Sequence, residues 1–480
     1  MRPFAIRLAE WVQSLRFEDV PPEVVESARD RVMDVLGICI AAHDVDAAVA
    51  VRRLREEWGP GRPEASFVGE RRRGPAAVAA LVNGTYAHAL DFDDTHLPSI
   101  VHPSAPMVPA ILAQAQAAGA TGREALVALV AAYELNTRLA MAQYDPELGN
   151  SVFFERGLHA TSILGAVAGA AGCARLRGLA ASGIADAIAI ACSMGAGLVE
   201  ANRAGGSVKK FHGGWAAHAA VTGAGMAAHG LTGPPTVLEG RFGLFRAFCG
   251  DRWRPEALTE ALGERWDTPG IVYKPYPCNH FTHAIVDAAL ALKARGLRPQ
   301  AVERVTIGTA AAAWRTIGDP IDEKRRPRTP YHAAFSGPFV FATALAGGSG
   351  LGVSTSDFSE ATLADPERRR IAEACEVVVD EECTRVFPGR LPAVVGVRTH
   401  DGQWLEERVM STRGGPDRPL SRGELTAKLA DNAGPVAPRL AAACAALAQA
   451  ASLDPLLAAT CPVPGSRAEA PAGARPERVR

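Results

Sequence analysis

The stretch PPEVVESARDRVMDVLGICIAA, residues 21–42, carries the pattern that decides the fold of this 480-residue chain. Two prolines open it, as prolines commonly do at the start of a helix. Apolar residues then recur at three- and four-residue spacing from Val24 to Leu36, which predicts an amphipathic helix. The same criterion predicts helices at about 74–89, 105–118, 122–142, 156–176, 180–197 and 214–230.

Small residues dominate several of these segments, as in GAVAGAAGC at residues 165–173. Small side chains let helix axes approach closely, and a helix that is apolar all round is buried on every side. The N-terminal half is therefore predicted to be a tightly packed helical bundle.

The character of the sequence changes after Trp266. Short β-branched runs appear at 302–307, 376–380 and 393–398, and the last is followed by the turn THDG and a second alternating run, which predicts a hairpin. Helices are predicted at about 280–295 and 333–347, and two more after Ser421, a plausible N-cap. The expected fold is mainly α, with a helical domain built from both chain ends and an inserted α+β lid domain. The expected boundaries are 1–266 and 411–455 for the helical domain, 267–410 for the lid and 456–480 for a disordered tail.

The composition of the chain argues against several classes of function. The formal net charge is −1, with 48% hydrophobic and 21% charged residues, so no bulk attraction to nucleic acid or to an anionic membrane is expected. The nine cysteines are odd in number and contain no CxxC pair, which favours a reducing compartment over a disulfide framework. The first residues lack the apolar run of a signal peptide, and the other apolar runs are interrupted by polar residues. A cytoplasmic protein without a membrane span is expected.

The densest polar cluster is HALDFDDTHLPSIVHPS, residues 88–104, which falls between two predicted helices. Loops on a rigid scaffold are common places for catalytic groups, and this one combines three carboxylates with three imidazoles. The alternative is a helix C-terminus followed by a cap for the next helix.

Three further clusters contain candidate functional residues. GLHATS at 157–162 begins an Ala/Gly-rich helix, GGSVKKFHGG at 205–214 places two lysines among glycines, and YKPYPCNH at 273–280 lies at the domain junction. The alternatives are a packing histidine, a solvated basic turn and a rigid linker, respectively. Together the clusters supply cations for carboxylates and imidazoles for proton transfer. They show no ligand spacing typical of zinc or an iron–sulfur cluster.

In order along the chain, these motifs resemble the MmgE/PrpD family, which includes 2-methylcitrate dehydratases, cis-aconitate decarboxylases and iminodisuccinate epimerases. The resemblance covers residues 4–450 or so and includes DVLG at 34–37, HALDFDDT at 88–95, HPS at 102–104, GLHAT at 157–161, KKFHGG at 209–214 and KPYP at 274–277. It implies an active site between the helical domain and the lid, and a homodimer. The active-site residues that it implies are Asp91, Thr95, His102, His159, Lys209 and Lys274.

The function predicted from this resemblance is that of a metal- and cofactor-independent lyase, a dehydratase or decarboxylase. Its substrate would be a small di- or tricarboxylate, and a proton would be moved beside a carboxylate. His102 is the predicted proton-transfer group, since imidazole titrates near neutral pH, and His159 is a second proton carrier or an orienting donor. Asp91 would orient a neighbour. The residues predicted to bind the substrate are Lys209, Lys274, Thr95, Ser104 and His280.

Three departures from the family pattern leave the substrate open: Asn279 and His280 after the KPYPC segment, and Phe339 where a tyrosine is frequent. Alternatives for the function are an epimerase of the same family, a terpene cyclase using the DxDD string at 91–94, and a non-catalytic family member. The low aromatic content of 6% and the two lysine clusters argue against a cyclase. Dehydration, decarboxylation and epimerisation are not distinguished by the sequence.

Overall fold

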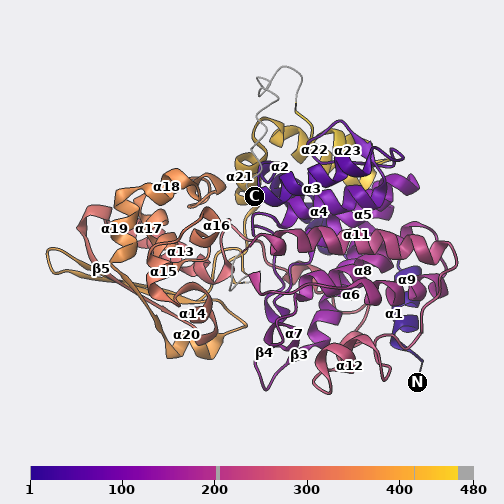
Figure 1. The fold of residues 1–480 in the computed structure, drawn as a ribbon, viewed down its shortest axis with the longest axis horizontal. Coiled ribbons are helices and arrows are strands. Elements are labelled where there is room, and N and C mark those ends of the chain that lie inside the picture. Colours follow the sequence, from indigo (N-terminus) through magenta and orange to yellow (C-terminus); the bar gives the residue numbers. More distant parts are fainter. Residues whose placement is uncertain (1, 202–205, 416, 463–480) are drawn as a thin grey trace.

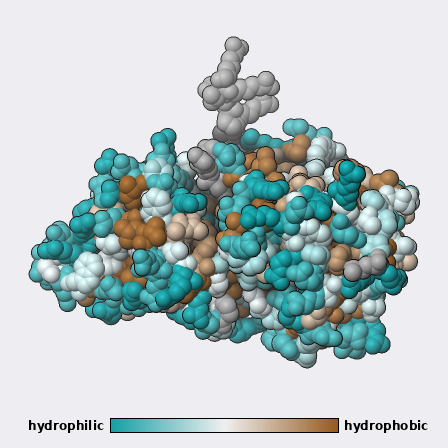
Figure 2. Space-filling view, turned by 90° about the horizontal axis from the view of Figure 1, so that it is seen from below, coloured by the Kyte–Doolittle hydropathy of each residue, from teal (hydrophilic) through white to brown (hydrophobic). Residues whose placement is uncertain are grey.

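The computed structural model describes residues 2–201, 206–415 and 417–462. The fold is mainly α. Figure 1 shows a large helical body, formed by the N-terminal half and by the yellow C-terminal helices, beside an orange α+β unit that contains α13 to β8. On the face drawn in Figure 2, hydrophobic residues occur in small separate groups within a largely hydrophilic surface.

The N-terminal part of the helical body confirms the predicted helices and adds others. It consists of α1 (Phe4–Ser14), α2 (Pro22–Ala41), α3 (Asp46–Trp58), α4 (Ala76–His88), α5 (Ser104–Ala118), α6 (Gly122–Ala142), α7 (Val152–Glu155), α8 (Ala160–Leu176), α9 (Ala181–Met194), α11 (Val208–Ala228) and α12 (Leu244–Cys249). Two short hairpins join them: β1 (Ala65–Ser66) with β2 (Arg73–Gly74), and β3 (Tyr144–Asp145) with β4 (Asn150–Ser151).

Two predicted helix starts were wrong, and both matter for the site. The helix predicted from 156 begins at Ala160, because Gly157 has φ +73° and His159 is the extended N-cap residue. The helix predicted from 214 begins at Val208. Lys209 and Lys210 therefore lie in the first turn of α11, and the helix fixes their direction.

Glycines set the close crossing of α4 and α11. A Cβ atom at Gly214 would lie 2.3 Å from the carbonyl oxygen of Leu81, and one at Gly84 would lie 2.8 Å from that of Gly213. Such distances are below van der Waals contact, so only hydrogen fits at these positions. The crossing places the C-terminal residue of α4, His88, beside the first turns of α11.

The long helix α6 is apolar enough to cross a membrane by length and composition, but its most apolar window is 94% buried inside the helical body. It also contains the ion pair of Glu134 with Arg138, at 2.7 Å. In this structure α6 is a core helix.

The α+β unit is built on a four-stranded sheet in the order β6-β5-β7-β8. β5 (Val302–Thr309) pairs in parallel with β6 (Cys375–Val379) and antiparallel with β7 (Ala393–Thr399), which forms the predicted hairpin with β8 (Trp404–Val409). Gly402 in its turn has φ +84°. The helices of the unit are α13 (His283–Ala294), α14 (Ala311–Ile317), α15 (Ile321–Arg325), α16 (Pro330–Ala333), α17 (Gly337–Gly347), α18 (Glu360–Ala364), α19 (Pro366–Glu373) and α20 (Glu381–Val386).

The chain then returns to the helical body. The side chain of Ser421 accepts a hydrogen bond from the Glu424 amide, as the N-cap of α21 (Arg422–Ala433), which confirms the predicted cap. α21 and α22 (Ala437–Ala445) pack on α2. Nζ of Lys428 lies 2.8 Å from a carboxylate oxygen of Asp34 on α2, and both side chains are buried. This buried pair ties the two chain ends together.

The predicted start of the disordered tail at residue 456 was wrong. Helix α23 (Asp454–Ala458) buries Leu456 and Leu457, and the hydroxyl of Thr460 accepts a hydrogen bond from the Gly69 amide. These contacts hold the chain against the core as far as Cys461, which is also buried. The rest of the predicted tail, 463–480, lies outside the described residues.

Candidate active site

A cavity of about 1640 Å³ opens between the helical body and the α+β unit. The cavity is lined by all six residues that the resemblance implies for the active site: Asp91, Thr95, His102, His159, Lys209 and Lys274. The predicted substrate-binding residue His280 also lines it. They come from the loop between α4 and α5, the N-terminal ends of α8 and α11, and the connection into the α+β unit. Tertiary folding thus gathers the four sequence clusters around one cavity.

Asp91 stands at the centre of the charged groups. Its backbone is left-handed, with φ +52°, a conformation that aspartate adopts more readily than most residues. Nζ of Lys209 donates to its Oδ1 at 2.9 Å, and Nζ of Lys274 lies 3.4 Å from its Oδ2 and donates to its carbonyl oxygen at 2.9 Å. Burial opposes the ionised form of Asp91, but the two lysines outweigh burial and hold the pKa of this carboxyl well below its usual range.

This arrangement differs from the roles that were expected for Lys209 and Lys274. From separate clusters, each lysine was expected to face its own substrate carboxylate. In the structure both lie against the same side chain, so Asp91, Lys209 and Lys274 together carry one net positive charge. The pKa of Lys209 is raised, since the attraction of Asp91 exceeds the effect of burial.

His102 has a defined proton arrangement. Its Nδ1 lies 2.8 Å from the carbonyl oxygen of Asp94 and 3.1 Å from the hydroxyl of Thr95. A carbonyl oxygen can only accept, so Nδ1 carries the proton in the neutral ring and Nε2 is left with its lone pair. Burial, and then the charge of Lys274, lowers the pKa of His102 to about 3. The imidazole of His102 is therefore neutral near pH 7.

Thr95 links His102 to His280. Its Oγ1 lies 3.2 Å from Nδ1 of His280, whose Nε2 is buried without a hydrogen-bond partner among the described residues. The backbone of Thr95 also exchanges two hydrogen bonds with Val272, at 2.9 and 2.8 Å. This bridge fixes the loop of the helical body to the segment that leads into the α+β unit.

Two histidines that were not predicted as site residues, His88 and His212, lie next to predicted ones. Nδ1 of His159 lies 2.8 Å from Nδ1 of His212, so one ring must donate and the other accept. Nδ1 of His88 lies 2.8 Å from Oδ2 of Asp93, and the His88 ring centroid is 5.6 Å from that of His102 and 5.5 Å from that of His159. His88 and Asp93 belong to the HALDFDD string and His212 to the KKFHGG string, so motif membership was the available signal.

Two residues singled out from the sequence do not line the cavity. The hydroxyl of Ser104, predicted to bind substrate, donates to Asp94 and lies 2.6 Å from the Tyr133 hydroxyl. Phe339 packs with Ala333 and Leu363 inside the α+β unit. Ser104 instead holds Asp94 in place, together with the buried Arg31, which pairs with Asp94 at 2.6 Å.

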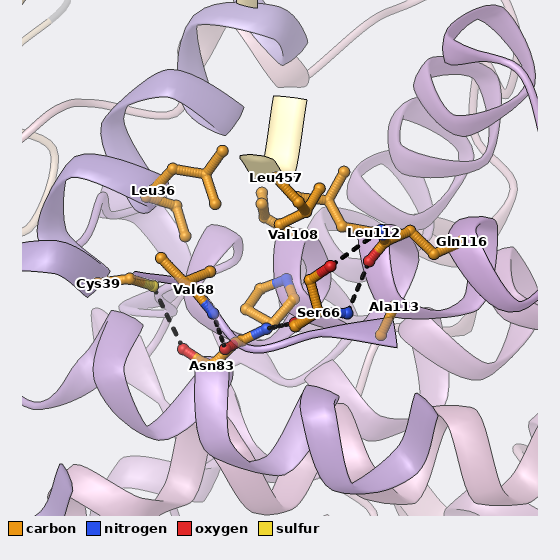
Figure 3. Close-up of a pocket in the computed structure, with 12 residues that line it drawn as sticks. Leu36, Cys39, Ser66, Val68, Asn83, Val108, Leu112, Ala113, Gln116 and Leu457 are labelled. Atoms are coloured by element: carbon orange, nitrogen blue, oxygen red, sulfur yellow. Dashed lines mark hydrogen bonds between the residues drawn. The ribbon is translucent and has the colours of Figure 1, made fainter. Parts of the chain in front are cut away.

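A second, much smaller cavity lies inside the helical body (Figure 3). Its volume is about 10 Å³, room for about one water molecule. The polar groups on its wall satisfy one another: the Val68 amide donates to Asn83, and the Ser66 amide donates to Gln116. Its remaining lining is mostly apolar, so we regard it as a packing void.

The lining of the large cavity includes lysines, imidazoles and carboxylates, among them Lys209, Lys274, His102, His159, His280 and Asp91. Within the described ranges, no three His, Cys, Asp or Glu side chains are grouped as metal ligands. What the site can do chemically is bind anions through Lys209 and Lys274 and exchange a proton at an imidazole nitrogen.

Comparison with known proteins identifies the family of the chain. The sequence model of the MmgE/PrpD N-terminal domain matches residues 6–256, and that of the C-terminal domain matches residues 276–453. The cis-aconitate decarboxylase-like protein oryM of Aspergillus oryzae is 26% identical over 441 residues, covering 88% of each chain. The cis-aconitate decarboxylase of Aspergillus terreus is 25% identical over 424 residues, covering 84% of each chain. The human cis-aconitate decarboxylase is 25% identical over 436 residues, covering 88% of this chain and 86% of the human one. Because the two domain matches account for most of its length, the chain belongs to the MmgE/PrpD family.

Proposed function

We propose that this protein is a lyase that decarboxylates a small polycarboxylate, with proton transfer at His102. The observation that carries the proposal is the pairing of a neutral imidazole, whose Nε2 is left free, with two buried lysines on one carboxylate. The relatives named above support decarboxylation over the other reactions of the family.

A bound anion would change the protonation of His102. Its negative charge, placed beside the ring, favours the imidazolium and raises the pKa of His102. His102 can then take up a proton at Nε2, while its Nδ1–H group continues to donate a hydrogen bond to the Asp94 carbonyl oxygen. Substrate binding would in this way convert the resting base into the acid that the reaction needs.

The chemical step balances without a cofactor. The bond between a carboxylate carbon and the substrate skeleton breaks, and carbon dioxide leaves. The electron pair of that bond passes into the skeleton, and a carbon atom accepts the proton from Nε2 of His102. Lys209 and Lys274 stabilise the negative charge that shifts during the step, as fixed charges do in a dry site. Nε2 of His102 then takes up a new proton from solvent.

The same residues argue against the terpene cyclase alternative. A cyclase acid must be a neutral carboxyl group, but the DxDD string here holds ionised aspartates. The pKa of Asp91 is lowered by the lysines, and that of Asp93 is lowered by His88, in both cases against the opposing effect of burial. Asp94 is committed to Arg31.

The experiment is turnover of cis-aconitate, citrate, 2-methylcitrate and iminodisuccinate in deuterated water, followed by proton NMR and by carbon dioxide release. Carbon dioxide with one deuterium on a product carbon is the expected result. Loss of water without carbon dioxide would identify a dehydratase, and deuterium exchange alone an epimerase. No reaction with any polycarboxylate would refute the proposal.

A further inference from the structure

The charge of the active site does not suffice for the substrate proposed above. Asp91, Lys209 and Lys274 have one net positive charge between them, and Asp93 places a further carboxylate 2.8 Å from His88. A di- or tricarboxylate brings two or three negative charges. Another cation is needed where the ligand extends beyond this centre.

Several other basic residues line the cavity. Arg315 is exposed on α14, and most of the others are already paired within the protein. Nζ of Lys210 lies 2.7 Å from Oδ1 of Asp46. The guanidinium of Arg156 donates to the carbonyl oxygens of Phe248 and Cys249, and Arg328 lies 3.7 Å from Glu323. These side chains have partners within the protein.

Lys324 on α15 differs from them. Only 7% of it is exposed, although it lines the cavity. Its Nζ donates to the carbonyl oxygen of Phe335 at 3.2 Å, and among the described residues no carboxylate oxygen lies within ion-pair distance of it. Burial lowers the pKa of Lys324, although Glu323 and Asp319 act in the opposite direction from farther away. A buried cation with one neutral acceptor costs stability, which points to a functional reason for keeping it.

Phe335 connects Lys324 to the catalytic centre. Nζ of Lys209 lies 5.7 Å from the centre of the Phe335 ring, while Nζ of Lys324 contacts the carbonyl oxygen of the same residue. The hydroxyl of Ser336 donates to the carbonyl oxygen of Lys324 and so fixes α15 to the start of α17. Lys209 and Lys324 thus both lie against Phe335, Lys209 from the helical body and Lys324 from the α+β unit.

We propose that Lys324 forms a second anion subsite that binds the distal carboxylate of a tricarboxylate substrate. The inference rests on the proposed function and adds the substrate class: three carboxylates, one of them held from the α+β unit. Dicarboxylates would occupy only the centre at Lys209 and Lys274.

The test compares Lys324→Met with the wild type and with Lys293→Met, a control on α13 outside the cavity lining. Calorimetry gives the dissociation constants of tricarballylate, a saturated tricarboxylate, and of glutarate, a dicarboxylate. Thermal melting and turnover of cis-aconitate are measured on the same samples. We expect Lys324→Met to weaken tricarballylate binding at least about tenfold, the effect of losing a charged hydrogen bond, and to change glutarate binding less than about twofold. Its melting temperature should be unchanged or raised, because methionine removes the buried charge.

Equal weakening of both ligands, or no weakening of tricarballylate, would overturn the subsite. A loss of melting temperature with unchanged ligand preference would show that Lys324 only supports the fold. Failure of the proposed function looks different: the wild type would bind both ligands and turn over none of the polycarboxylates. Lys293→Met should match the wild type throughout.

Discussion

Nζ of Lys209 lies 2.9 Å from Oδ1 of Asp91, a residue 118 positions earlier in the chain, and both side chains are buried. Lys274 shares the same carboxylate from the other side. Asp91 is therefore the counter-ion of the anion-binding centre, and the charge that a substrate meets depends on it.

The first prediction removes that counter-ion. Asp91→Asn keeps a residue that tolerates the left-handed backbone but leaves two buried lysines without a carboxylate. We expect a loss of about 3–5 kcal/mol in the free energy of unfolding, the usual cost of breaking a buried ion pair, measured by urea denaturation. Citrate should restore more stability to the variant than to the wild type. Asp322→Asn, at an exposed carboxylate, is the control, and equal stability of the two variants would contradict the assignment.

The second prediction concerns His102. His102→Asn should lower kcat about a hundredfold or more, the usual scale of general acid–base catalysis, while the melting temperature changes little. The matched control is His218→Asn on α11, where the ring is half-buried and bonded to the Ala77 carbonyl oxygen. An active His102→Asn enzyme would remove the proton-transfer assignment.

The third prediction is the pH dependence of stability. Burial lowers the pKa of His102 and His283 to about 3 and that of His212 to about 4, whereas in the unfolded chain histidine titrates near pH 6.5. Below that value the unfolded state binds more protons, so each such histidine lowers stability by about 1.4 kcal/mol per pH unit as the pH falls toward the folded-state pKa. Above about pH 7 these groups add no slope.

Urea denaturation at intervals from pH 8 to pH 5 checks this slope. His283→Gln should reduce it by the contribution of one group, because His283 is buried and neutral in the fold. An identical slope in the variant and the wild type would show that His283 does not titrate differently on unfolding.

The fourth prediction is that turnover survives dialysis against EDTA to within about twofold. In the proposed mechanism Lys209, Lys274 and Lys324 supply the positive charges that face the substrate, and Nδ1 of His102 donates to the Asp94 carbonyl oxygen. Activity that is lost on chelation and returns with one added metal ion would show that a metal site is required.

The fifth prediction tests the helix crossing that positions His88 and Lys209. Gly214→Ala should cost about 1–3 kcal/mol of stability, because its Cβ meets the Leu81 carbonyl oxygen at 2.3 Å and forces α4 and α11 apart. Gly225→Ala in the same helix has its nearest neighbour at 3.5 Å and should be neutral or stabilising by up to about 1 kcal/mol. Equal melting temperatures of the two variants would contradict the close crossing.

The sequence by itself determined most of the long helices, the α+β character after Trp266, the β7–β8 hairpin and the Ser421 cap. Periodicity and turn chemistry are local properties, and they report which face of an element is buried. The family motifs also pointed to six residues that the structure places in the lining of the cavity. The two wrong helix starts belong to α8 and α11, where the polar residues His159 and Lys209 lie at the N-terminal end of the helix and apolar spacing is uninformative.

The tertiary structure alone decided which of these side chains meet. That Lys209 and Lys274 share Asp91 and that His159 faces His212 depend on contacts made over long sequence separations. The same holds for Lys324, which stands in a charged, unremarkable segment of sequence and becomes distinctive only through its burial beside Phe335. The physical reason is that the strength of a charge depends on its burial and on its partners, and neither can be read from the spacing of residues along the chain.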